Sequence, residues 1–452
     1  MTKQKTIDMT EGSLPKNILF FSLPLMLTQM LEVLFNLSDV AIAGKYADYI
    51  ALGAVGSTTL LVSLFTGILI GVGSGVNVRV AHRLGAQKAD GDTSATARTI
   101  YTAFAVCGVI GIIVCFICGI FARPMLEALN TKDELIDGAV MYLHIYSLGM
   151  PAMALYNFGN GVLSACGDTK RPLVYLSAAG VLNVLLNLFF VIVCKMAADG
   201  VALASVIAQY VSAVLILRRL LTTDDSCRLR ISHRLFDKKA CKGVLMIGIP
   251  TGMQNAIFAV ANLFVQTGVN HFDAIMVSGN SAAANADTLI FNVMSAFYTA
   301  CASFISRNHG AGKNDRIMKT YGISLAYSFA AGAVFGGSLL FFGRQFLSLF
   351  TNEPRVVEAG MQRVMIMGWS YCISAFMDCT IAASRGIGRS VAPTVIVIMG
   401  SCVFRVIWVY TVFAHFMTIP SLYLLYSFSW AITAAAEIVY FMHSYKKFIK
   451  AP

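Results

Sequence analysis

The feature that most constrains this chain is a series of apolar runs, each about 20 residues long and almost free of charge. A run of that length crosses the hydrocarbon core of a bilayer as one α-helix. Only 13% of the 452 residues are charged and 57% are hydrophobic, so little chain remains for a soluble catalytic domain. We therefore predict an all-α polytopic membrane protein. Its twelve transmembrane helices are expected at residues 15–42, 53–80, 99–121, 139–163, 173–194, 200–221, 244–269, 281–305, 320–342, 358–382, 391–413 and 419–442.

A polar interval over residues 222–243 divides the helices into two sets of six. We predict an amino-terminal six-helix lobe over residues 1–221, a cytoplasmic linker over 222–243 and a carboxy-terminal six-helix lobe over 244–452. The basic residues of the linker are Arg228, Arg230, Arg234, Lys238, Lys239 and Lys242.

An internal repeat supports this division. Pro24, Gly85 and Gly167 match Pro250, Gly310 and Gly388, respectively, at nearly constant offsets of 226, 225 and 221 residues. Because each half has six spans, both halves begin on the same side of the membrane. They are then parallel repeats related by a pseudo-twofold axis along the membrane normal, an arrangement typical of transporters that alternate the exposure of a central cavity.

The distribution of Lys and Arg predicts the orientation. Of the 34 basic residues, 26 fall in the termini and in the loops on the same side as the termini, and seven fall in the opposite loops. Basic loops stay in the cytoplasm, so both termini are expected there, in a multi-pass protein of the cell (inner or plasma) membrane. The net charge of +11 is then explained by topology, and nucleic acid is not an expected partner.

The eleven cysteines are odd in number, and eight of them lie within or at the ends of apolar runs. We expect small, buried, reduced thiols, with neither a disulfide framework nor a metal site.

Several short segments, in order along nearly the whole chain, resemble the multidrug and toxic compound extrusion (MATE) family of antiporters. They are LPLMLTQ and SDVAIAG in the first helix, RLGAQK, GDTKRP, NVLLN, GVALASVIAQ, GIPTGMQNA and NHGAGKNDR. The resemblance implies a V-shaped pair of six-helix lobes. It also implies export of organic, often cationic, compounds in exchange for Na⁺ or H⁺, with no cofactor.

Asp39 is the strongest candidate for a coupling residue, because a carboxylate inside the bilayer is costly and is a functional candidate by default. The resemblance makes it the cation-coupling aspartate, with Asn183, Asn187 and Ser205 as partners. Asn187 stands where some family members have a second acid. One negative charge leaves two alternatives open, which are Na⁺ held by Asp39, Asn183 and Asn187, and protonation of Asp39. A third interpretation is a polar cluster that only ties three helices together.

A second group of polar residues is expected to line the substrate cavity. These candidates are Gln29, Glu32, Gln254, Asn255, Asp287, Asp378 and Arg405. The alternative for Arg405, the only basic residue placed in mid-membrane, is a structural ion pair with Asp378 or Asp287. The glycines Gly67, Gly71 and Gly75, and likewise Gly332 and Gly336, recur every four residues and predict close helix packing.

The sequence thus predicts a secondary active multidrug efflux transporter that is not an enzyme, works as a monomer and exchanges small organic cations for H⁺ or Na⁺. Membrane lipid is its other expected partner. One alternative is a flippase for lipid-linked precursors, which share the two-lobed plan but generally need a basic cavity. Five intramembrane acids, with Glu437 as the fifth after Glu32, Asp39, Asp287 and Asp378, argue against it. An intramembrane enzyme is the weaker alternative, since no DDxxD, HExxH or GxSxG segment occurs, and a channel fits the repeat less well.

Overall fold

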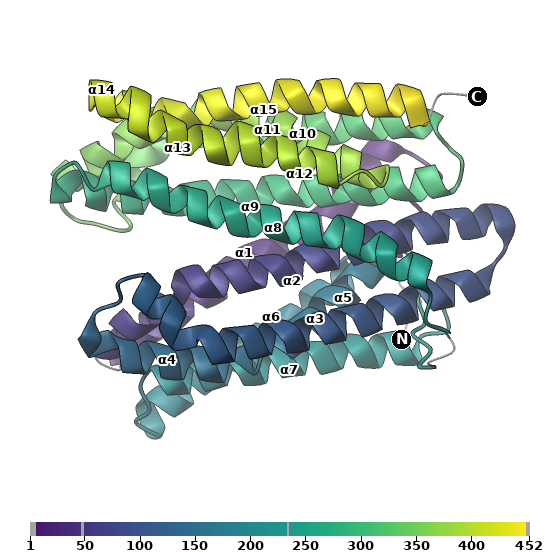
Figure 1. Ribbon diagram of the computed structural model, residues 1–452, viewed down its shortest axis with the longest axis horizontal. Coiled ribbons are helices and arrows are strands. Elements are labelled where there is room, and N and C mark those ends of the chain that lie inside the picture. Colours follow the sequence, from purple (N-terminus) through teal and green to yellow (C-terminus); the bar gives the residue numbers. More distant parts are fainter. Residues whose placement is uncertain (1–5, 47–48, 233–234, 449–452) are drawn as a thin grey trace. The chain divides into compact units, whose positions relative to one another are not determined.

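The computed structural model describes residues 6–46, 49–232 and 235–448, and it is helical with no strand in these ranges (Figure 1). Arg234 and Lys450 lie outside the described residues. The first half contains α1 (Leu14–Tyr46), α2 (Tyr49–Asp90), α3 (Thr93–Ala128), α4 (Asp133–Ser147), α5 (Met150–Ala165), α6 (Lys170–Leu188), the π-helical turn η1 (Phe189–Val193) and α7 (Ala198–Thr222). The second half contains α8 (Lys238–Val269), α9 (Ala274–Gly310), α10 (Asp315–Leu347), α11 (Pro354–Gly386), α12 (Val391–Val397), η3 (Ile398–Val403), α13 (Phe404–Trp408), η4 (Val409–Phe413), α14 (Ala414–Phe416) and α15 (Ile419–Phe448).

All twelve predicted spans are present in the described residues as eleven long apolar helices and one bent pair. The helices are longer than the apolar runs, because their polar ends continue past the thickness that the hydrocarbon core requires. Residues 139–163 were expected as one helix, and this was wrong. They form α4 and α5, which meet at an angle of 46°. Pro151 lies in the first turn of α5, where its missing N–H costs nothing, whereas inside a continuous helix it would remove a hydrogen bond.

The chain forms two compact units. Unit 1 comprises Met1–Asp8 and Leu27–Ala256, and unit 2 comprises Met9–Met26 and Ile257–Pro452. The boundaries between the units fall inside two helices. The first part of α1 belongs to unit 2 and the rest of it to unit 1, whereas the first part of α8 belongs to unit 1 and the rest of it to unit 2. These two units, which are defined by contacts between residues, do not have the bounds of the predicted lobes. The division into six-helix lobes at residues 222–243 therefore stays a prediction.

Helices pack closely within each unit where glycines leave room. In unit 1, α2 packs against α3, α4 and α5, and a Cβ on Gly75 would lie 2.6 Å from the carbonyl oxygen of Val244 in α8. In unit 2, α11 packs against α9, α10 and α15 (Figure 1), and a Cβ on Gly332 would lie 3.3 Å from the backbone of Tyr371. The predicted packing role of these glycines is therefore confirmed. Backbones can approach this closely only where no side chain intervenes.

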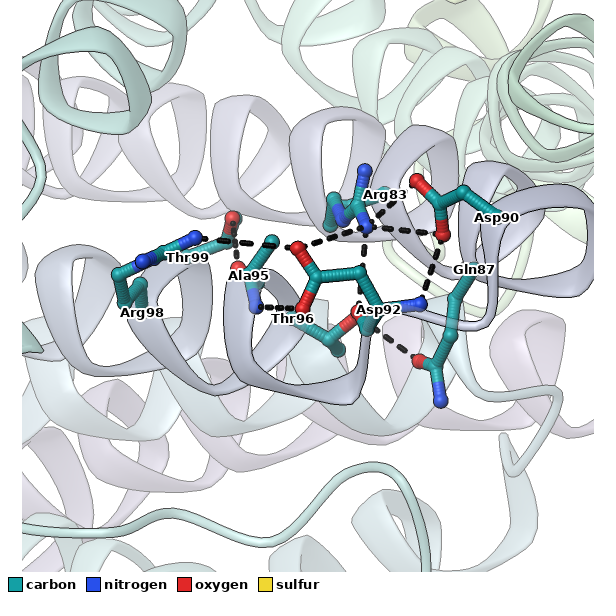
Figure 2. A network of polar contacts seen from close by, with 8 residues as sticks. All are labelled: Arg83, Gln87, Asp90, Asp92, Ala95, Thr96, Arg98 and Thr99. Atoms are coloured by element: carbon teal, nitrogen blue, oxygen red, sulfur yellow. Dashed lines mark hydrogen bonds and ion pairs between the residues drawn. The ribbon is translucent and has the colours of Figure 1, made fainter.

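The RLGAQK segment lies in the last turns of α2, where it fixes the joint with α3 (Figure 2). Arg83 Nη2 donates to Asp90 Oδ2 at 2.8 Å and to the carbonyl oxygen of Asp92 at 3.1 Å. Asp92 caps α3 by accepting from the backbone N–H of Ala95 at 3.0 Å. Thr96 Oγ1 donates to Gln87 Oε1 at 2.8 Å. These contacts connect the end of α2 to the start of α3. They give the Arg and the Gln of the RLGAQK segment a structural role.

The NHGAGKNDR segment of unit 2 holds the start of the chain. Asn308 Nδ2 donates to the carbonyl oxygen of Met9 at 3.0 Å, and Lys313 Nζ donates to that of Thr10 at 3.0 Å. Arg316 Nη2 donates to the carbonyl oxygen of Gly12 at 3.2 Å.

Two glycines matched by the internal repeat share one backbone conformation. Gly167 has a φ of 86° and Gly388 a φ of 80°, both in the left-handed region that residues with a Cβ rarely adopt. Each ends the turn that follows a span, so the match in sequence corresponds to a match in local structure.

The expectation that the thiols are all reduced was wrong for one pair. Cys166, after α5, and Cys227, after α7, are joined by a disulfide with their Cα atoms 6.5 Å apart. The two residues are 61 positions apart and belong to no spacing motif, so only the packing of unit 1 brings them together.

Candidate functional site

Asp39 lies in α1, within unit 1, and its carboxylate faces α6 and α7. Asn187 Nδ2 donates to Asp39 Oδ1 at 2.6 Å, and Ser205 Oγ donates to Oδ2 at 3.0 Å. Asn183 Nδ2 donates to Ser205 Oγ at 3.2 Å. The four residues named from the sequence therefore form one connected polar cluster, which is buried except for the half-buried Asp39.

The cluster follows from helix geometry. Asn183 and Asn187 are four residues apart on α6 and so lie on one face. They are joined to each other, since Asn187 Nδ2 also donates to Asn183 Oδ1 at 3.3 Å. Two residues after Asn187, at Phe189, the helix widens into the π-helical turn η1, a feature frequent at functional sites.

One acceptor of this cluster has no partner in the described residues. Asn187 Oδ1 is buried and accepts no hydrogen bond, although the amide nitrogen of the same side chain donates twice. A buried acceptor of this kind is costly to leave unpaired. Among the side-chain oxygens of these four residues, it is the one that accepts no hydrogen bond in the described part of the chain.

Asp39 opens onto a cavity of about 270 Å³ inside unit 1. Glu32, seven residues earlier on α1, lines the same cavity, which places two carboxylates on its wall. Other polar and aromatic lining residues are Phe35, Thr58, Thr59, Ser63, Thr66, Tyr142, Tyr146, Tyr156, Asn157, Asn183, Ser205, Gln209 and Ser212. A cavity with two acids and several aromatic rings can attract an organic cation both by charge and by ring faces.

Three cavity candidates from the sequence, Gln29, Gln254 and Asn255, are not among the residues that line this cavity. Asn255 Nδ2 donates to the carbonyl oxygen of Gly67 at 3.1 Å, so it joins α8 to α2 at the glycine contact. Gln254 is buried and Gln29 is half-buried.

Asp287 lies in unit 2 and is held by a residue that the sequence did not single out. Arg363 Nε donates to Asp287 Oδ2 at 3.1 Å, and its Nη2 forms an ion pair with the same carboxylate. Tyr371 Oη donates to Oδ1, and Asn280 Oδ1 accepts from Arg363 and from Tyr423, the latter at 2.9 Å. Both carboxylate oxygens are thus occupied by protein donors.

Arg363 is one of the seven basic residues that the Lys and Arg distribution assigns to the opposite loops, and Arg405 was expected to be the only cation in mid-membrane. This was wrong, because α11 begins at Pro354 and buries Arg363 against α9. The signal was available, since Arg363 is the tenth residue of α11 and an Arg inside a span is normally paired.

Arg405 is not part of an ion pair in the described residues, so the expected pairing with Asp287 or Asp378 is wrong. Its Nη1 donates to Asn262 Oδ1 at 3.2 Å and its Nε to Ser429 Oγ at 3.5 Å. Its guanidinium lies over the ring of Tyr426, 4.5 Å from the centroid. Asp378, on α11, is half-buried and also forms no ion pair within the described ranges.

Comparison of this sequence with known proteins identifies a family. The model of the MatE family matches residues 24–189 and 250–411, one segment from each half of the chain. A Bacillus subtilis protein named Probable multidrug resistance protein YpnP is 27% identical over 379 residues, covering 81% of both chains. The FAD transporter of Shewanella oneidensis is 22% identical over 367 residues, covering 78% of both chains.

The fold agrees with solved structures. A MOP superfamily transporter from Pyrococcus furiosus is 19% identical and superposes with a TM-score of 0.91 over 100% of both chains. An outward-facing multidrug resistance transporter of the MATE family also superposes with a TM-score of 0.91, at 18% identity over 100% of both chains. This likeness supports twelve transmembrane helices in two lobes. Since the family model covers most of both halves, this chain belongs to the MatE family of multidrug efflux transporters.

Proposed function

We propose that this protein is a secondary active antiporter that exports organic compounds, and that Asp39 is where the coupling cation binds. The observation that carries the proposal is the hydrogen-bonded cluster of the half-buried Asp39 with the buried Asn187 and Ser205, at the wall of a cavity. A carboxylate in a membrane span is expensive to maintain, and here it is held by side chains of two other helices. An ion that binds there with different strength in two arrangements of the helices shifts the equilibrium between them.

A proton is the coupling ion that the donor pattern favours. Each oxygen of Asp39 accepts one hydrogen bond from a neutral donor, and the cluster holds one formal negative charge. Neutral donors compensate a carboxylate only in part, so burial favours uptake of a proton. Turning the Asn187 amide by 180° would present Oδ1 to a protonated Asp39 and give its unpaired acceptor a partner.

Sodium is the second candidate, and the same amide supports it. After that turn, Asn187 Oδ1, Asn183 Oδ1 and the Asp39 carboxylate would offer oxygens from three side chains, the ligand type that hard cations prefer. A single charge favours weak binding, so we rank this alternative below the proton.

Cationic substrates are proposed because Glu32 and Asp39 line one cavity together with Tyr142, Tyr146 and Tyr156. Asp287 is withdrawn as a substrate contact, since Arg363 neutralises it. Asp378 stays a candidate. We also propose that the protein works as a monomer in the cell membrane. Both termini are proposed to be cytoplasmic, on the strength of the Lys and Arg distribution.

The decisive experiment replaces Asp39 with Asn in purified protein reconstituted into liposomes. Efflux of a fluorescent organic cation is measured under a pH gradient and, separately, under a Na⁺ gradient. Asp39→Asn keeps the size of the side chain but removes the charge, so gradient-driven efflux should fall to the level of empty liposomes. Asp137→Asn is the matched control, because it removes one acid from the surface of the same unit, where the side chain is 82% exposed. Normal efflux by Asp39→Asn would rule out the proposed role.

A further inference from the structure

The guanidinium of Arg405 is buried in unit 2 with no carboxylate against it in the described part of the chain. Its residue exposure is 3%. Its two hydrogen-bond partners, Asn262 and Ser429, are both neutral. Three aromatic rings surround it, with centroids at 4.5 Å for Tyr426, 5.5 Å for Phe258 and 5.9 Å for Trp430. We call these six residues the Arg405 site.

A guanidinium carries five N–H donors in one plane, and the described residues accept from only two of its nitrogens. Ring faces attract a cation, but they replace only part of the lost hydration. An Arg inside a span is normally paired with an anion, and a buried charge without one is strongly destabilising. The Arg405 site therefore lacks an anion that its chemistry calls for.

No neighbouring acid lies within ion-pair distance of Arg405 in the described residues, although the charge of Asp378 acts on the guanidinium from farther away. Asp287 is held by Arg363 and Tyr371, which occupy both of its oxygens. Arg363 also lies near the Tyr426 ring, 5.7 Å from the centroid, so two guanidinium groups share one aromatic side chain and only one of them is neutralised. Arg405 is therefore the one of these two guanidinium groups that has no carboxylate in direct contact among the described residues.

The backbone and the surface at this position also point to a ligand. Arg405 is the second residue of α13, a single turn between the π-helical turns η3 and η4, and such turns are frequent at functional sites. Asn262 is exposed on α8, so the guanidinium nitrogen that it accepts from lies just beneath the surface of unit 2. An anion could replace the Asn262 amide at that nitrogen.

We propose that the Arg405 site binds an oxyanion, a carboxylate or a phosphate, attached to a flat apolar group. The oxyanion would accept two parallel N–H bonds from the guanidinium, and the flat group would lie against the rings of Tyr426, Phe258 and Trp430. As a substrate site it rests on the proposed export function, which it deepens by adding amphoteric and acidic aromatic compounds to the cations. The same chemistry could come from an anionic lipid headgroup.

The tryptophan content gives a direct test. The chain has three Trp residues, at positions 369, 408 and 430, and only Trp430 lies within 6 Å of Arg405 in the described contacts. Replacing Trp369 and Trp408 with Phe leaves one fluorophore beside the site. In detergent without lipid, 1-naphthoate should change Trp430 fluorescence in a saturable way, whereas 1-naphthamide, its neutral counterpart, should not.

The variants assign the response to the guanidinium. Arg405→Gln should weaken naphthoate binding at least tenfold. Arg405→Lys should also weaken it several-fold, because an ammonium cannot form two parallel bonds, and it keeps the charge if the Gln variant does not fold. Arg344→Gln is the matched control, since it removes one Arg from the surface of the same unit, and it should bind normally.

A second arm identifies the source of the oxyanion. Nanodiscs of phosphatidylglycerol are compared with nanodiscs of phosphatidylcholine. If phosphatidylglycerol abolishes the naphthoate response, the oxyanion is a lipid headgroup, and if the response persists in both, it belongs to a substrate. The proposal would be overturned if both Arg405 variants bound naphthoate as tightly as the parent protein does. A response of the parent to naphthamide or to chloride alone that equals its response to naphthoate would also overturn it. Because no gradient is used, failure here is distinct from failure of coupling at Asp39.

Discussion

Replacing Asp287 with Asn should destabilise unit 2 by far more than an ordinary polar substitution. The carboxylate accepts from Arg363 Nε at 3.1 Å and forms an ion pair with its Nη2, and the two residues are only 9% and 7% exposed. Asp287→Asn leaves the guanidinium of Arg363 buried without its counter-charge. Breaking a buried pair in this way costs about 3–5 kcal/mol.

A double variant tests whether the loss of stability comes from the unpaired charge of Arg363. Arg363→Met with Asp287→Asn removes both charges and keeps most of the volume, so it should be within about 1–2 kcal/mol of the parent protein. The coupling energy of the double-mutant cycle should then be large, because the residues are in direct contact. For a unit of this size, about 1 kcal/mol corresponds to a shift in Tm of about 2–4 °C.

Thermal unfolding of the purified protein in one detergent, followed by fluorescence, measures these differences. Asp287→Asn should lower the Tm by about 6–20 °C, and the double variant should recover most of the loss. Glu358→Gln, which breaks an exposed ion pair with Arg344 in the same unit, should change the Tm by no more than about 2–4 °C. A single variant as stable as the parent, or a double variant no more stable than the single one, would refute the reasoning.

Three further predictions concern coupling, packing and orientation. Asn187→Asp places a second carboxylate beside Asp39, so a Na⁺-coupled protein should gain Na⁺ dependence in liposome efflux, whereas a proton-coupled one should show no such gain. Gly75→Val should lower the Tm or abolish expression, because a Cβ there would lie 2.6 Å from the carbonyl oxygen of Val244. Gly56→Val is the control in the same thermal assay and should be tolerated, because nothing lies within 4 Å of its Cβ position. A reporter fused after Lys450, active only in the cytoplasm, should be active, and activity of a periplasmic reporter at that position would contradict the orientation inferred from Lys and Arg.

The helices were predictable because membrane insertion leaves a strong one-dimensional signal. An apolar run must be long enough to cross the bilayer and must satisfy its own backbone hydrogen bonds, so length and composition define each span. The bend between α4 and α5 was missed, although Pro151 marks it, because a run of apolar residues reads the same whether it is straight or broken.

The sequence indicated which polar side chains lie inside the membrane, but it indicated less well which of them contact each other. Asp39, Asn183, Asn187 and Ser205 were grouped by resemblance, and the structure brings all four into one hydrogen-bonded cluster, while their role in coupling stays a proposal. For Arg405, the alternative of an ion pair with Asp378 or Asp287 came from the argument that buried charges must be neutralised. That rule is sound, but Arg363 satisfies it for Asp287.

The sequence by itself determined the fold class, the spans, the repeat and the residues that a membrane protein would not retain without a reason. Only the tertiary structure decided which of those residues meet. Asp39 is 148 residues from Asn187, and Asp287 is 76 from Arg363, and the disulfide joins cysteines 61 residues apart. Such pairs depend on the rotation and crossing of whole helices, which side-chain packing sets and which no local pattern in the chain records.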